Sequence, residues 1–146
     1  MGDFLYACVQ LVHNLGAAAV VGSPAVAWWL VGSNHCAGIA PTVTTGNIRH
    51  RLAWFTLIAW STQLISGAGF GTTTYFLKHQ LPDLTGIGFA ALSIKIGCAM
   101  ISLTLALIYL RSGTRWTHRR QLAAWQALFL LGLTALMSAA FLRWYA

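Results

Sequence analysis

Four long apolar stretches dominate the pattern of hydrophobic and polar positions, and short polar segments separate them. They cover residues of about 5–31, 52–77, 84–110 and 122–145. Each is longer than the ~20 residues with which an α-helix crosses ~30 Å of hydrocarbon. The pattern predicts a single domain over residues 1–146, an all-α integral membrane bundle of four antiparallel transmembrane helices.

The composition agrees with a membrane setting. Hydrophobic residues make up 58% of the chain and charged residues 8%, whereas a soluble domain carries about 25% charged residues. The chain opens with "MGDFLYAC", which has an acidic residue where a signal peptide has basic ones, so we expect the first helix to be retained. We therefore predict a multi-pass protein of the bacterial cytoplasmic (inner) membrane.

The arginines predict how the helices are oriented. They concentrate in two predicted loops, residues 32–51 and 111–121, as Arg49, Arg51, Arg111, Arg115, Arg119 and Arg120. The positive-inside rule places both loops in the cytoplasm and both termini on the outer (periplasmic) side. Most of the net charge of +7 would then lie beside anionic lipid headgroups. We therefore expect the lipid bilayer as a partner, and no nucleic acid.

A lysine interrupts the third apolar stretch, "GFAALSIKIGCAMISLTLALIYL" at residues 88–110. A charge such as Lys95 at the centre of a bilayer costs about 2.5–3.5 kcal/mol on insertion scales. The chain has two acidic residues, Asp3 and Asp83, and neither lies in an apolar stretch. Three partners for Lys95 stay open: a bound ligand, a carboxylate of a neighbouring subunit, or the membrane surface and the backbone.

His13 is the one histidine of five that falls well inside an apolar stretch. By helical rise, His13 lies ~12 Å from the outer end of its helix, and Lys95 lies ~17 Å from the outer end of its own. Both residues therefore belong to the outer half of the bilayer. Small and polar residues share their surroundings. These are Gly16 and Ala17 after His13, Ala91 and Ala99 beside Lys95, and Gln63, Ser66, Gly67, Gly71 and Thr74 on the second helix.

Two interpretations of these residues stay open. Small residues at helical spacing are typical of close helix packing, and His13 would then bond to a serine, a threonine or the backbone. Small residues equally leave space for a flat macrocycle between His13 and Lys95.

The sequence resembles the copper-resistance protein D (CopD-like) family over nearly its whole length. The resemblance lies in "LVHNLGAAAVVGSPAVAWWL", "RHRLAWFTLIAWSTQLISGAGFG" and "GIGFAALSIKIGCAMISLTLALIYLR". The chain is also similar to the HemJ type of four-helix protoporphyrinogen oxidase, in which a first-helix histidine and a later lysine are associated with haem b. His13 and Lys95 match those positions in kind. The aromatic and proline-rich pattern after that histidine is absent here, so the resemblance implies the haem site rather than the oxidase activity.

The chemistry of the two side chains suits a haem b cofactor without the resemblance. Burial in hydrocarbon favours the neutral amine of lysine, which is a nitrogen ligand, and imidazole is the standard haem ligand. His13 and Lys95 would bind one iron from two sides. Alternatively, Lys95 would pair with a haem propionate while His79 or Gln63 takes the second position. One histidine within the stretches limits the chain to a single haem.

Copper is the alternative metal. Cu(I) favours soft ligands, and the candidates are His35, Cys36, His50, Cys98 and Met100. Cys98 and Met100 are two residues apart, so on a helix they point ~200° away from each other. His35 and Cys36 lie in "NHC", which has no recurrent metal-ligand spacing, so a polar loop is the favoured interpretation.

The sequence has no phosphate-binding loop, no H-E-x-x-H and no nucleophile elbow, so we do not expect the chain to be an enzyme on its own. The predicted function is membrane electron transfer, or a redox subunit beside a larger membrane or periplasmic redox protein. One alternative is CopD-like copper transport or copper handling. The other is a non-catalytic structural subunit of a membrane complex, with Lys95 facing a neighbour's carboxylate.

Overall fold

The computed structural model describes residues 2–36, 43–78 and 86–145, and these ranges are helical except at 116–117. The α-helices are α1 (Gly2–Cys36), α2 (Val43–Lys78), α3 (Gly86–Ser112) and α4 (His118–Tyr145). A 3₁₀ turn, η1 (Gly113–Arg115), follows α3 directly. Within these ranges no residue forms a strand, so the prediction of an all-α chain is confirmed for them.

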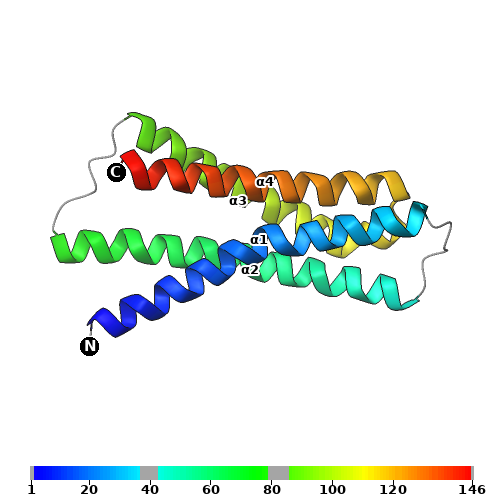
Figure 1. Cartoon of the computed structure of the whole chain (residues 1–146), viewed down its shortest axis with the longest axis horizontal. Helices are drawn as coiled ribbons and strands as arrows, with labels where there is room; N and C mark the ends of the chain where they lie inside the picture. The colour runs from blue at the N-terminus through cyan, green and yellow to red at the C-terminus, as the bar shows by residue number, and fades with distance from the viewer. Residues whose placement is uncertain (1, 37–42, 79–85, 146) are drawn as a thin grey trace.

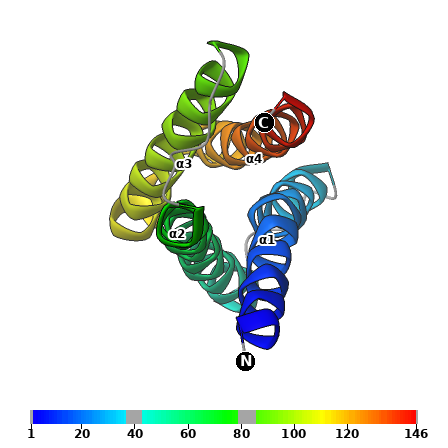
Figure 2. The same cartoon turned by 90° about the vertical axis from the view of Figure 1, so that its left-hand side faces the viewer.

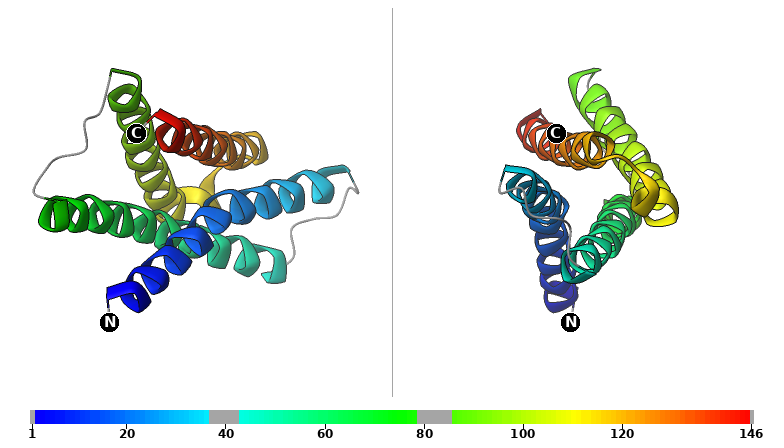
Figure 3. Two further views of the ribbon diagram at one scale, coloured as in Figure 1. Left: turned by 60° about the vertical axis from the view of Figure 1, so that its left-hand side comes forward. Right: turned by 90° about the vertical axis from the view of Figure 1, so that its right-hand side faces the viewer.

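The four helices form an up-and-down bundle. Helices α1 and α3 each pack against both α2 and α4, and consecutive helices run in opposite directions (Figure 1). The start of α1 and the end of α4 therefore lie at the same end of the bundle. The first half of α1 crosses α2, and the start of α1 diverges from the other helices (Figures 1 and 2). The rotated views show the same divergence (Figure 3).

Three helices are long and apolar enough to cross a membrane. Their spans are Ala7–Ser33 in α1, Gly86–Arg115 over α3 and η1, and His118–Leu142 in α4. The surface agrees, because large apolar side chains point outward on every helix, among them Leu15, Ile65, Phe89 and Met137. An apolar exterior of this extent suits lipid as the surroundings. The described residues thus indicate a multi-pass membrane protein.

Two predicted boundaries are wrong. The loop expected at residues 32–51 is helical at 32–36 and 43–51, so Arg49 and Arg51 lie on α2. The loop expected at 111–121 is non-α-helical only at 113–117. The physical reason is that apolar residues mark the part of a helix suited to hydrocarbon, whereas the backbone hydrogen bonds continue through polar residues beyond it.

A contact between α1 and α4 depends on a proline and a glycine. Pro24 inside α1 has no N–H, so the carbonyl of Val20 lacks its helical donor. Gly132 on α4 packs against this carbonyl, since a Cβ at Gly132 would lie 2.8 Å from the Val20 oxygen. The missing side chain of Gly132 therefore lets α4 approach α1 closely. On the other side of α1, the Ser23 hydroxyl lies 2.7 Å from the Thr56 hydroxyl of α2.

Candidate functional site

A cavity of about 510 Å³ lies between α1, α2 and α3, with Leu142 of α4 also in its wall, in the half of the bundle where α1 and α3 begin. Four side chains with polar atoms line it, namely His13, Trp60, Gln63 and Lys95, and the rest of its lining is mainly apolar. Sites for small molecules and cofactors have this character: about 300–1,000 Å³, mostly apolar, with a few convergent polar groups.

His13 is held at its ring by α2. Its Nδ1 lies 2.8 Å from the Ser66 hydroxyl oxygen, and the same hydroxyl lies 2.6 Å from the carbonyl oxygen of Thr62. A carbonyl only accepts, so the single hydroxyl hydrogen of Ser66 is donated to Thr62. We therefore assign the proton of the neutral imidazole to Nδ1, which donates to Ser66. The lone pair of the ring then lies on Nε2.

The backbone of His13 is held from the same helix. The side-chain amide of Gln63 donates from Nε2 to the His13 carbonyl. Gly16 makes this possible, because a Cβ at Gly16 would lie 2.8 Å from that amide nitrogen. Gly16, expected in the site as a small neighbour of His13, thus contacts Gln63 and leaves room for the amide to reach the α1 backbone.

Lys95 reaches the same cavity from α3, where its side chain is half-buried. Among the described residues its amine has no hydrogen-bond or ion-pair partner, and no carboxylate lines the cavity. Trp60 also lines the cavity. It is 2% exposed, and its indole N–H is enclosed by protein without an acceptor in the described part of the chain. The amine of Lys95 is therefore the group in the cavity that suits a ligand with acceptors.

The structure brings some of the other predicted residues to this cavity and not others. Ala99 lines it together with His13, Gln63 and Lys95. Ala91 instead lines a separate apolar cavity of about 340 Å³ between α3 and α4. Ala17 is half-buried on α1 and is not part of the lining. His79 lies outside the described residues.

The predicted copper ligands do not converge where they are described. Cys98 is 7% exposed and Met100 is 55% exposed, on opposite sides of α3. His50 lines a different cavity near the start of α2. The side chains of His35 and Cys36 lie outside the described part of the structure. Within that part, no group of three or more His, Cys, Asp or Glu residues is placed to hold a metal ion.

Sequence reasoning missed two contributors to the site. Trp60 was not expected in it, and Ser66 was noted only as one small polar residue of the second helix. The signal was present, because Trp60, Gln63 and Ser66 are spaced three residues apart and so lie on one face of α2. Both Gln63 and Ser66 are buried.

The chain was compared with models of known families, with curated proteins and with solved structures, and none of them matches. The contacts in the cavity are therefore the grounds for a functional proposal.

Proposed function

We propose that this protein holds one haem b in the cavity between α1, α2 and α3, and that it serves membrane electron transfer beside a larger redox protein. The observation that carries the proposal is the meeting of His13 and Lys95 in one mainly apolar cavity. They come from different helices and are the two nitrogen-bearing side chains that the sequence singles out. The resemblance of the sequence to haem-binding four-helix proteins agrees with it.

The surroundings of His13 support its role as a ligand. Metal-bound histidines almost always donate their other ring N–H to a fixed acceptor, which sets the tautomer and the ring orientation. The Nδ1–H of His13 has such an acceptor in Ser66, and Gln63 fixes the backbone beneath the ring. Nε2 would then be the atom that binds iron.

Lys95 and Trp60 supply the remaining interactions. The amine of Lys95 would either bind the iron or pair with a propionate, and both roles would offset the cost of a lysine in the bilayer. The indole ring of Trp60, which lines the cavity, would pack against the cofactor. Haem supplies one-electron chemistry when bound. The protein residues hold and orient it, and the apolar lining keeps water away, which influences its potential.

The proposal includes a fourth membrane span along α2 and an orientation with both termini outside. The arginines support the orientation, because Arg49 near the start of α2 and Arg111 at the end of α3 lie at the same end of the bundle (Figure 1). Arg119 and Arg120 in the first turn of α4 lie there too. This end would face the cytoplasm of a bacterial inner membrane.

One observation also favours a second candidate function. Because Lys95 has no partner among the described residues, a neighbouring subunit with an intramembrane carboxylate would satisfy it equally well. The protein would then be a structural subunit without a cofactor. This candidate predicts that the isolated chain is colourless and that Lys95 variants lose their partner subunit.

A double variant tests the haem proposal. The protein and its His13→Ala/Lys95→Ala form would be purified in mild detergent, and haem per chain would be measured by the pyridine haemochrome spectrum. We expect haem in the parent protein and its loss in the double variant. His50→Ala, which removes a histidine outside the cavity, is the matched control and should keep its haem. Equal haem in all three proteins would disprove the proposal.

A further inference from the structure

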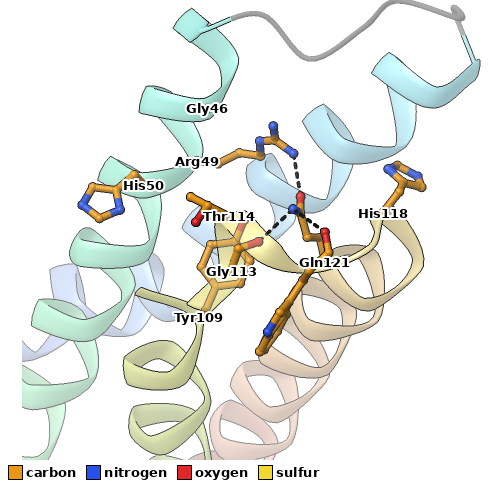
Figure 4. A pocket seen from close by; sticks show the side chains of 9 residues that line it. Gly46, Arg49, His50, Tyr109, Gly113, Thr114, His118 and Gln121 are labelled. Atoms are coloured by element: carbon orange, nitrogen blue, oxygen red, sulfur yellow. Dashed lines mark hydrogen bonds between the residues drawn. The ribbon is translucent and has the colours of Figure 1, made fainter. Parts of the chain in front are cut away.

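A second cavity, of about 330 Å³, lies at the other end of the bundle, between the start of α2, the end of α3 and the start of α4. Figure 4 shows Arg49 reaching from α2 toward Gln121, with Thr114 between the helices and His118 at the start of α4. His50 also lines the cavity, and Tyr109 and Trp116 provide aromatic surface. Among the described residues, no carboxylate lines it.

The guanidinium of Arg49 is fixed by a chain of hydrogen bonds. The amide nitrogen of Gln121 donates to the carbonyls of Gly113 at 2.9 Å and Trp116 at 3.3 Å, so both ends of this side chain are defined. Its amide oxygen then accepts from Nη1 of Arg49 at 2.7 Å. This bond orients the planar guanidinium of Arg49 at the wall of the cavity before any ligand binds.

The start of α4 adds positive charge to the same place. The N-terminus of a helix carries about half a positive elementary charge, and acidic residues are favoured there. The first turn of α4 has no acidic residue and instead carries His118, Arg119 and Arg120. Of these three residues, His118 lines the cavity, and none of the described lining residues is acidic. An anion from outside the chain would therefore meet no acidic side chain there.

We infer that this cavity binds a phosphate group, carried by an anionic lipid headgroup or by a small phosphate compound. Arginine matches the geometry of phosphate with two parallel N–H bonds, and helix N-termini are favourable phosphate sites. The hydroxyl of Thr114 and the imidazoles of His50 and His118 are further donors around the opening. The apolar spans of α3 and α4 end at Arg115 and begin at His118, so the cavity lies at the level of lipid headgroups. This inference does not depend on haem binding.

Native mass spectrometry of the full chain in detergent tests the site. The probes are dioleoyl-phosphatidylglycerol, dioleoylglycerol, which has the same chains without phosphate, and inorganic phosphate. We expect phosphatidylglycerol to bind and dioleoylglycerol not to bind. Arg49→Gln should weaken binding roughly tenfold, as expected for a charge-assisted hydrogen bond. Arg111→Gln, which removes an exposed arginine outside the cavity, should change it less than twofold.

The two sources of phosphate give different results. If millimolar inorganic phosphate displaces the lipid, and Arg49→Gln weakens the binding of both, the ligand is a small phosphate compound. If inorganic phosphate does not displace the lipid, the ligand is the lipid headgroup. Equal weakening by Arg49→Gln and Arg111→Gln would overturn the inference, because a general surface charge would then explain the binding.

A second variant covers the case in which Arg49→Gln does not fold. Thr114 is exposed at the cavity and takes no part in the bond between Arg49 and Gln121. Thr114→Asp should therefore repel phosphate and reduce binding at least as strongly, and clearly more than Thr114→Asn, which also removes the hydroxyl but is neutral. Unchanged binding in Thr114→Asp would overturn the inference independently.

Discussion

The ring nitrogen Nδ1 of His13 on α1 lies 2.8 Å from the hydroxyl of Ser66 on α2. This part-buried bond joins the two helices. It fixes the imidazole in one tautomer and one orientation at the wall of the cavity that Lys95 reaches from α3. A histidine that is oriented in this way is prepared to bind a metal through its other nitrogen.

The first prediction concerns Ser66. Ser66→Ala removes the acceptor of Nδ1–H, so the ring loses its fixed orientation and haem affinity should fall about 10- to 100-fold. The transfer of haem to apomyoglobin, followed by absorbance, measures the loss. Ser61→Ala is the matched control, because Ser61 makes the same kind of bond to a helix carbonyl away from the cavity. If Ser66→Ala and Ser61→Ala release haem at equal rates, Ser66 does not position the ligand.

The second prediction concerns Gly16. The methyl group of Gly16→Ala would lie 2.8 Å from the amide nitrogen of Gln63 and would push that amide away from the His13 carbonyl. The flexible end of Gln63 can move aside, so the main loss is its hydrogen bond to the His13 carbonyl, and we expect the free energy of unfolding to fall by about 0.5–1.5 kcal/mol. Gly22→Ala is the control, since nothing lies within 4 Å of its added Cβ. Unfolding by SDS titration compares the two, and a Gly16→Ala protein as stable as Gly22→Ala would contradict the contact.

The third prediction concerns the contact between α1 and α4. In Gly132→Ala the new methyl group would lie 2.8 Å from the Val20 carbonyl oxygen, which is backbone and cannot rotate away. The two helices should separate, with a loss of about 1–3 kcal/mol in the free energy of unfolding. Gly97→Ala on α3, with open space around its Cβ, should be neutral or slightly stabilising. The melting temperatures of the two variants in detergent check this, and equal temperatures would argue against close packing at Gly132.

The fourth prediction separates stability from ligand binding at Lys95. Lys95→Met removes an amine that has no partner among the described residues. The haem-free protein should therefore become more stable, by about 1 kcal/mol or more, while haem retention falls. Ser93→Ala, on the exposed side of α3, should change neither property. Loss of stability in haem-free Lys95→Met would show that Lys95 has a structural partner within the chain.

The helices themselves were predictable from the sequence. In lipid a chain must satisfy its backbone hydrogen bonds internally, so a long apolar run is a helix. Helical rise also placed His13 and Lys95 in the same half of the bilayer. It did not give the rotation that turns both side chains to one cavity. The helix ends did not follow. Arg49 and Arg51 belong to a polar extension of α2, and hydropathy carries no signal for such an extension.

The rotation of each helix was not predictable, and two alanines show why this matters. Ala91 and Ala99 are both small and buried on α3, and both were expected beside Lys95. They are eight residues apart, so at 3.6 residues per turn they differ by roughly 80° around the helix axis. Ala99 therefore lines the cavity with His13, whereas Ala91 faces α4. The packing of α3 against α2 and α4 decides this difference, and one sequence does not encode it in a readable pattern.

The most direct test of the central claim is an optical spectrum of the purified protein in mild detergent, oxidised and then reduced with dithionite, with metal analysis of the same sample. The proposal predicts a Soret band, sharpened α and β bands on reduction, and about one iron per chain. A colourless protein without iron, expressed in cells supplied with haem and purified without cofactor loss, would contradict it.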